Sequence, residues 1–125
     1  MEENKIEKLI EVMKAERQGS LSAEWEYMVR NDTEFMTAYQ ALHPVCFYDR
    51  KYLKESFREL IAICILAHRG DVDSVKSHCK RLLGAGVVQE GEIVEALETT
   101  LLPGGANTLL TGIKGLLRAK AELEK

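Results

Sequence analysis

Apolar residues recur along most of the chain with the spacing of an α-helix. Near the start, a stripe at positions i, i+3, i+4 and i+7 predicts a helix over residues 3–17, formed by Ile6, Leu9, Ile10 and Met13. Ser22 and Asp32 are typical N-cap residues, and each precedes a further short helical pattern. The residue before a proline avoids the α region, so we expect the second of these helices to end at His43-Pro44.

After a connector at residues 45–52, the helical pattern resumes over residues 53–69. The second half of this segment, LIAICILA, is apolar on every side, which predicts a central helix buried all round. Gly70 ends it, and Asp71 then caps a helix that runs to about residue 83. Further helices are expected over residues 89–101 and from residue 106 onward, separated by Pro103-Gly104-Gly105.

The apolar residues of these last two helices predict their inward faces. They are Ile93, Val94, Leu97 and Leu101 in the first, and Ala106, Leu109, Leu110, Ile113 and Leu117 in the second. Alternating strand patterns and internal repeats are absent from the sequence. We therefore expect an all-α bundle of six to seven helices in a single domain over residues 1–125.

Composition narrows the class of protein. With 125 residues, 46% hydrophobic and 30% charged, the chain is typical of one folded soluble domain. Its net charge of -3 argues against a nucleic-acid surface, and its longest apolar run, residues 60–67, is too short to span a membrane. The first ten residues lack the features of a signal peptide, so we expect a cytoplasmic protein.

The cysteines and histidines do not have the spacing of a metal site. Cys46, Cys64 and Cys79 form no CxxC pair, and the three histidines form no HxH or HxxxH pair, so we expect no metal. All three thiols are expected to be inert, with Cys64 and Cys46 in packing roles.

Two polar residues fall on helix faces that should otherwise be apolar. Glu59 lies one turn before Ala62 and Ile63 of the central helix, and His78 neighbours apolar residues on the next helix, on one face with Asp71 and Ser74. A carboxylate beside an imidazole can hold it in one tautomer and prepare it for proton transfer. The same pair can equally be a hydrogen-bonded part of the core, and spacing alone leaves both readings open.

The order of these residues resembles the carboxymuconolactone decarboxylase family, which includes the alkyl-hydroperoxidase D (AhpD) branch. The resemblance covers about residues 50–115 and extends more weakly to residues 25–42. It rests on Arg58-Glu59-Leu60 before an apolar helix, His78 further on, Gly84-Ala85-Gly86, an acidic helix opening before Ile93, and Gly104-Gly105. It implies an AhpD-like helical bundle.

The redox branch of this family carries the signature E-x11-C-x2-C-x3-H. Aligned on Glu59 and His78, its two cysteine positions are occupied here by Asp71 and Ser74. That branch requires an attacking thiolate and a resolving thiol. Cys79 does not replace either one, because it lies on a different side of the helix from His78. We therefore expect no thiol peroxidase activity of the CxxC type.

The pattern that remains resembles the decarboxylase branch and implies a cofactor-free lyase acting on a small carboxylated lactone or related acid. His78 would move the proton and Glu59 orient it, or the reverse. Arg58, Lys76 and Arg81 are the candidate cations for an acidic substrate, and Arg58, Asp71, Ser74 and Arg81 are the expected substrate-binding positions.

The resemblance also implies a homo-oligomer, commonly a trimer or hexamer, in which a neighbouring chain could complete the site. A non-catalytic member that keeps the fold and the Glu59–His78 pair for assembly or ligand binding is the alternative. A contact between these two side chains in an open pocket would favour the enzyme. A sealed contact would favour the alternative.

Overall fold

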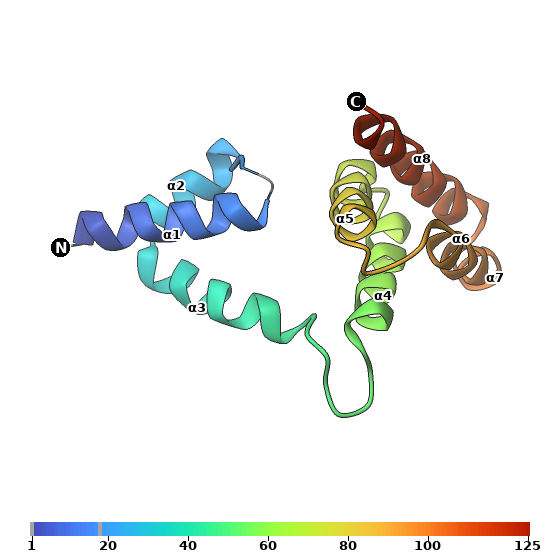
Figure 1. The fold of residues 1–125 in the computed structure, drawn as a ribbon, viewed down its shortest axis with the longest axis horizontal. Coiled ribbons are helices and arrows are strands. Elements are labelled where there is room, and N and C mark those ends of the chain that lie inside the picture. The colour runs from blue at the N-terminus through green and yellow to red at the C-terminus, as the bar shows by residue number, and fades with distance from the viewer. Residues whose placement is uncertain (1, 18) are drawn as a thin grey trace. The chain divides into compact units, whose positions relative to one another are not determined.

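Residues 2–17 and 19–125 are described by a computed structural model (Figure 1). Helices are the only regular elements in these two ranges: α1 (Glu2–Glu16), α2 (Ala23–Asn31), α3 (Thr33–Val45), α4 (Glu55–His68), α5 (Val72–Ala85), α6 (Glu90–Thr99), α7 (Leu101–Gly104) and α8 (Ala106–Leu123). The predicted all-α class is confirmed, and the helix count exceeds the expected six to seven because α7 is a separate four-residue helix. Among the described residues, none of the helices is both long enough and apolar enough to cross a membrane.

The chain divides into two compact units, Met1–Cys46 and Phe47–Lys125. The first contains α1, α2 and α3, which pack against one another around a small core of Ile10, Met13, Val29 and Met36 (Figure 1). Ser22 and Asp32 cap α2 and α3 as predicted, each accepting a hydrogen bond from the backbone N–H three residues on. A single domain over the whole chain stays a prediction.

The predicted end of α3 at His43-Pro44 is wrong, because the helix continues through Pro44 to Val45. A proline in the last turn removes only one helical hydrogen bond, so its cost is small there. The backbone N–H of Cys46 then closes the turn by donating to the carbonyls of Leu42, at 3.3 Å, and His43, at 3.2 Å.

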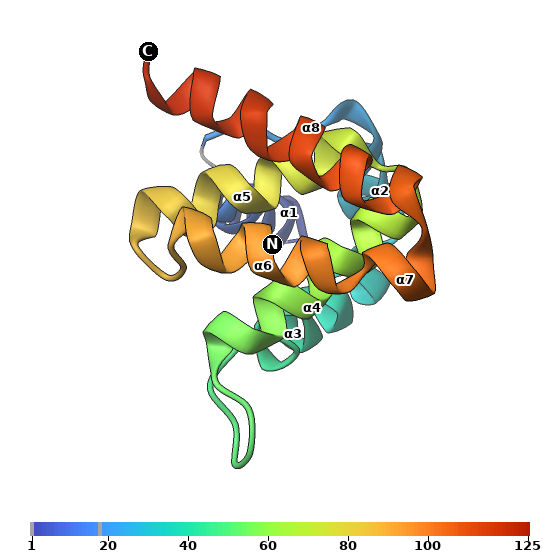
Figure 2. The ribbon, with the colours of Figure 1, turned by 90° about the vertical axis from the view of Figure 1, so that its right-hand side faces the viewer.

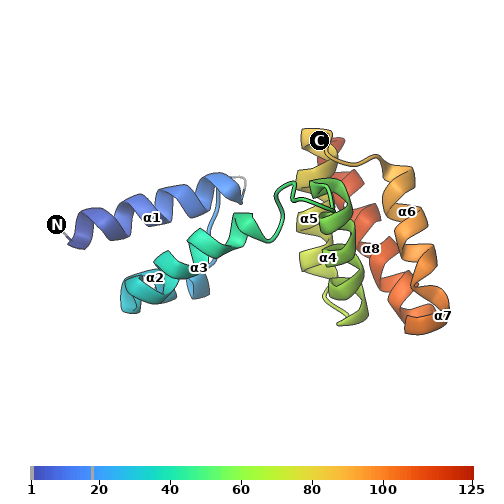
Figure 3. The same ribbon diagram turned by 90° about the horizontal axis from the view of Figure 1, so that it is seen from below.

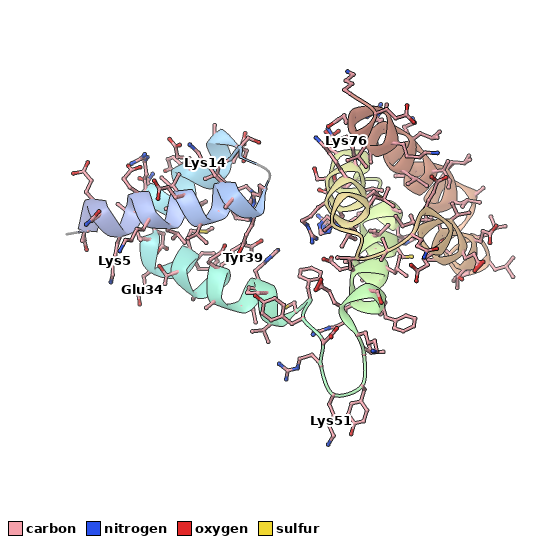
Figure 4. All side chains as sticks on the ribbon, in the orientation of Figure 1. Lys5, Lys14, Glu34, Tyr39, Lys51 and Lys76 are labelled. Atoms are coloured by element: carbon pink, nitrogen blue, oxygen red, sulfur yellow. The ribbon has the colours of Figure 1, made fainter. Side chains whose placement is uncertain are left out.

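The segment before α4 is tied to the first turn of that helix. Lys51 lies at the tip of the loop (Figure 4). On one side of the tip, Asp49 Oδ1 accepts a hydrogen bond from the backbone N–H of Glu55 at 2.7 Å, and so serves a helix terminus whose N-cap, Lys54, makes no side-chain bond. Arg58 Nη1 donates to the Tyr48 carbonyl at 2.8 Å.

The second unit has its core where α8 packs against α4, α5 and α6 (Figures 2 and 3). The fully buried side chains come from all four helices and from the α5–α6 connection: Ile63, Ala67, Val75, Cys79, Leu82, Val88, Ile93, Leu97, Leu116 and Ala119. Burial of this set is the main source of stability for this unit.

The prediction that the central helix is buried all round is wrong. Within α4 only Glu59, Ile63 and Ala67 are buried, and Phe57, Ile61 and Ile65 leave 57%, 50% and 57% of their surface exposed. The reason is that the other helices of this unit cover one side of α4 and leave an apolar face open.

The inward face of α8 also differs from the one predicted. Its buried residues are Thr108, Gly112, Gly115, Leu116 and Ala119. Of the residues predicted to face inward, Leu109 and Ile113 pack against the core, whereas Ala106, Leu110 and Leu117 are exposed, as is Leu101 in α7.

Close helix packing is the physical reason. A Cβ added at Gly112 would overlap Leu97, and one at Gly115 would overlap Val75, so α8 approaches its neighbours through its smallest residues rather than through its largest apolar ones. A pattern that counts only large side chains cannot register such a face.

Candidate functional site

Glu59 is the buried carboxylate that the sequence pattern singled out. It lies on the side of α4 that faces α5 and is 1% exposed. A carboxylate in such a position must be paired or lose its charge, because transfer of an unpaired ion out of water is costly. Its position in the buried stripe of α4 confirms the expectation from spacing.

Both charge partners of Glu59 come from α5. Arg81 Nη2 donates to Glu59 Oε2 at 2.7 Å, and His78 Nδ1 lies 3.6 Å from Glu59 Oε1. The second distance is longer than a hydrogen bond, and Oε1 has no hydrogen-bond partner among the described residues. Arg81 and His78 are 35% and 23% exposed, so solvent reaches the site through them while Glu59 stays covered.

Two opposing effects set the pKa of Glu59. Burial acts to raise it, but the interactions with His78 and Arg81 and the positive charge of Arg81 outweigh burial, and the net result is a pKa below the ordinary 4.5. Glu59 is therefore a carboxylate at neutral pH.

His78 Nδ1 lies near one hydrogen-bond donor and one hydrogen-bond acceptor, and it cannot satisfy both at once. Arg81 Nη2 lies 3.4 Å away and can only donate, which requires a lone pair on Nδ1. Glu59 Oε1 can only accept, and it is satisfied when Nδ1 carries a proton. A hydrogen on Nδ1 thus supplies the donor that the buried oxygen lacks. The contacts with Arg81 and with Glu59 therefore fit different forms of the imidazole.

Phe47 covers the imidazole from the loop before α4. Its ring centroid lies 6.2 Å from that of His78, with the planes tilted by 52°. Sequence reasoning missed this residue, because an aromatic residue in a connector gives no signal of what it will contact.

The other predicted substrate-binding residues occupy different positions. Asp71 caps α5: its Oδ1 accepts from the Ser74 backbone N–H at 3.1 Å and its Oδ2 from the Ser74 hydroxyl at 2.7 Å. The hydrogen bond from the Ser74 hydroxyl, followed by that from the Ser74 backbone, holds the pKa of Asp71 below its usual 3.8. The two residues that we aligned with the cysteine positions of the redox branch therefore stabilise the start of α5.

Only one of the three candidate cations reaches Glu59. Arg58 donates to the Tyr48 carbonyl, and Lys76, on α5 (Figure 4), pairs with Glu122 at 2.9 Å. Arg81 alone bonds to the buried carboxylate. Sequence spacing nominated all three, because it does not resolve which long side chain folds inward.

The cysteines lie apart from this site. Cys79 is buried, which raises the pKa of its thiol to about 12, and burial also raises the pKa of Cys64. Both are therefore protonated thiols at neutral pH. Cys46 is exposed, so the packing role predicted for it is wrong: it follows α3 at the boundary of the first unit. Among the described residues, no three histidine, cysteine or acidic side chains gather in a way that could hold a metal ion.

A groove of about 850 Å³ lies on another face of α4. It is lined by Phe57, Ile61 and His68 from α4, by residues of α6, and by Thr108 at the start of α8. Glu59 and His78 do not line it. At about 100° per residue, Glu59 is roughly half a turn around α4 from Phe57 and Ile61.

Comparison with known proteins identifies the class. The family model of the carboxymuconolactone decarboxylase family matches residues 33–115, from the start of α3 into α8. The chain belongs to this family. The match confirms the resemblance drawn from Glu59, His78 and the glycines, and it reaches further toward the N-terminus than residues 50–115. Searches of curated proteins and of solved structures returned no match.

Proposed function

We infer that this protein is a cofactor-free lyase that decarboxylates a small carboxylated lactone or a related acid by proton transfer at His78. The observation that carries this inference is the buried, ionised Glu59, which lies beside a partly exposed imidazole and is bound to Arg81. Family membership supports the reaction class, since the family is named for carboxymuconolactone decarboxylase.

The reaction requires a path for one electron pair and one proton. As the bond between the ring carbon and the substrate carboxylate breaks, CO2 leaves and the electron pair moves into the conjugated lactone as an enolate. The imidazolium of His78 then donates its proton to carbon, and solvent restores that proton afterwards. Glu59, whose Oε1 lies 3.6 Å from Nδ1, holds the ring in place.

Arg81 is the cation best placed to bind an acidic substrate. A guanidinium has five N–H donors, and in Arg81 an N–H of Nη2 donates to Glu59. The donors on its other nitrogens can bind a substrate carboxylate on the solvent side, because the side chain is 35% exposed. Asp71 and Ser74, which bond to each other, contribute to the shape of the site rather than to its charge in this proposal.

Assembly and location belong to the same proposal. The apolar side chains left exposed in α7 and α8, Leu101, Leu102 and Leu110, support a homo-oligomer, a trimer or a hexamer in this family, in which a neighbouring chain contributes to the site. We place the protein in the cytoplasm, because its three cysteines have no disulfide pattern and its first ten residues lack the features of a signal peptide. A light-scattering mass of about 14 kDa at micromolar concentration would contradict assembly.

The test is CO2 release from carboxymuconolactone and from a panel of small β-keto acids at millimolar concentration. We expect turnover without added metal or cofactor, reduced at least 100-fold in His78→Gln, since general acid catalysis contributes about 10²–10⁴-fold. His43→Gln, a histidine of the first unit whose ring lies 5.8 Å from Tyr39, is the matched control and should keep full activity.

Two outcomes would contradict the proposal. Full turnover in His78→Gln removes the mechanism. No CO2 from any acid of the panel, with wild-type protein shown to be folded, removes the reaction class.

A non-catalytic role is the second candidate, and one observation favours it. The groove of about 850 Å³ is lined by a different face of α4 and not by Glu59 or His78. In that case Glu59 and Arg81 serve only to fix α5 against α4, and small molecules bind elsewhere. The two candidates separate in the CO2 assay, because a non-catalytic protein shows no turnover that His78→Gln could reduce.

A further inference from the structure

The groove beside α4 has the size and composition of a small-molecule site. Its volume of about 850 Å³ falls within the roughly 300–1,000 Å³ of typical ligand pockets. Phe57, Ile61 and Ile65 form one apolar wall, and Ala96 of α6 lies on another side. From Phe57 to His68 the helix rises about 16 Å, at about 1.5 Å per residue, which suits an elongated apolar molecule.

A chain of hydrogen bonds at the end of the groove fixes the state of His68. Thr108 Oγ1 donates to the Gly104 carbonyl at 2.9 Å and lies 3.0 Å from His68 Nδ1. A hydroxyl has one hydrogen, and that hydrogen is used at Gly104, so Nδ1 must be the donor to Thr108. Neutral His68 therefore carries its proton on Nδ1 and presents Nε2 as a hydrogen-bond acceptor.

Gly104 is required by this arrangement for space. A Cβ at this position would lie 2.9 Å from Thr108 Oγ1 and 3.4 Å from His68 Nδ1, so any larger residue would press on both partners. Thr108 is 3% exposed, which makes its hydroxyl a fixed part of the interior. The Nδ1 side of the His68 ring thus lies against a buried hydroxyl, although the residue as a whole is exposed.

The charged and thiol groups of the groove limit the ligand further. Glu92 and Glu95 line it together with one cation, Arg69, so an anionic ligand meets net repulsion. The Cys64 thiol is occupied, because it donates to the Ala96 carbonyl at 3.5 Å. A neutral ligand therefore fits better than an acid.

We propose that this groove binds a neutral, elongated apolar molecule with a hydroxyl at one end, whose O–H donates to His68 Nε2. The apolar body lies along Phe57, Ile61 and Ile65. This site is separate from Glu59 and His78, so it stands whether or not the protein is a lyase.

The test compares three probes of equal chain length at neutral pH: 1-octanol, methyl octyl ether and octanoate. Binding is followed by the shifts of backbone amide signals in α4 and α6. We expect 1-octanol to bind about fivefold tighter than the ether, which has no O–H to donate, and octanoate to bind most weakly. In His68→Phe the preference for the alcohol over the ether should disappear.

A carboxylate introduced into the apolar wall of the groove should abolish binding of 1-octanol. The same substitution at an exposed position outside the groove should leave binding unchanged. Ile61→Glu places a carboxylate at a position 50% exposed in the groove, and Leu117→Glu does the same at a position 58% exposed on α8 that does not line it. Urea denaturation checks that both variants fold.

Three results would overturn the proposal. They are equal affinity for alcohol and ether in the wild-type protein, a preference for the alcohol that persists in His68→Phe, and an absence of shifts in α4 and α6. The third result has a specific explanation if the wild-type protein is an oligomer and Ile61→Glu is a monomer. In that case the groove is the contact surface for a second copy of this chain.

Discussion

Replacing Arg81 by methionine leaves the buried Glu59 carboxylate without its guanidinium partner. Methionine keeps most of the aliphatic bulk of the side chain and removes the charge. Breaking a buried pair by removal of one partner costs about 3–5 kcal/mol. Because Arg81 is 35% exposed, solvent screens part of the interaction, and we expect a loss of about 2–3 kcal/mol at pH 7.

The pKa of Glu59 determines how the stability loss in Arg81→Met changes with pH. In the wild-type protein the pKa of Glu59 lies below 4.5, so the ionised pair contributes stability above about pH 4.5 that is lost as the pH falls through the folded-state pKa. Without Arg81, two of the interactions that lower the pKa of Glu59 are lost, so this pKa rises above its wild-type value. The difference in free energy of unfolding between wild type and variant should therefore shrink as the pH falls from 7 toward 4.

Urea denaturation at a series of pH values measures this difference. Arg81→Met/Glu59→Gln should recover part of the loss at pH 7, because the neutral amide needs no counter-charge. Arg118→Met is the control: Arg118 pairs with Asp73 at 3.8 Å, with both side chains exposed, and its removal should change stability by less than about 0.5 kcal/mol.

A loss in Arg81→Met that is the same at pH 7 and pH 4 would refute the reasoning, since it would place the effect in packing and not in the charge of Glu59. A loss no larger than that of Arg118→Met would refute it as well, because Glu59 would then not depend on Arg81.

Two further predictions concern packing and thiol exposure. Gly115→Ala should lower the free energy of unfolding by about 1–3 kcal/mol in urea denaturation, because the added Cβ overlaps Val75, whereas Gly91→Ala, with open space around it, should be neutral or slightly stabilising. In a thiol titration of the native protein at pH 8, exposed Cys46 should react first, and buried Cys79, whose pKa is about 12, only after unfolding; equal rates would contradict the burial of Cys79.

Much of the fold could be predicted from the sequence, because helix starts are local events. Ser22, Asp32 and Asp71 each cap the helix that follows, as an N-cap side chain bonds to a backbone N–H only three residues on. The end of α3 was predicted less well, since a rule about proline describes one residue and not the hydrogen bonds that follow it.

The candidate site was also predicted only in part from the sequence. That Glu59 is buried could be inferred from its place in an apolar stripe, and that Asp71 begins the next helix could be inferred from its residue type. That Arg81 is the partner of Glu59, rather than Arg58 or Lys76, depends on where long flexible side chains reach between helices.

The sequence by itself determined the all-α class, most of the helices, the family and the burial of Glu59. Only the tertiary structure decided which faces are covered. It placed glycines rather than leucines in the core face of α8, left the apolar face of α4 open beside His68, and set Arg81 on Glu59. The physical reason is that periodicity reports which residues share a face, whereas burial depends on how closely another helix can approach that face.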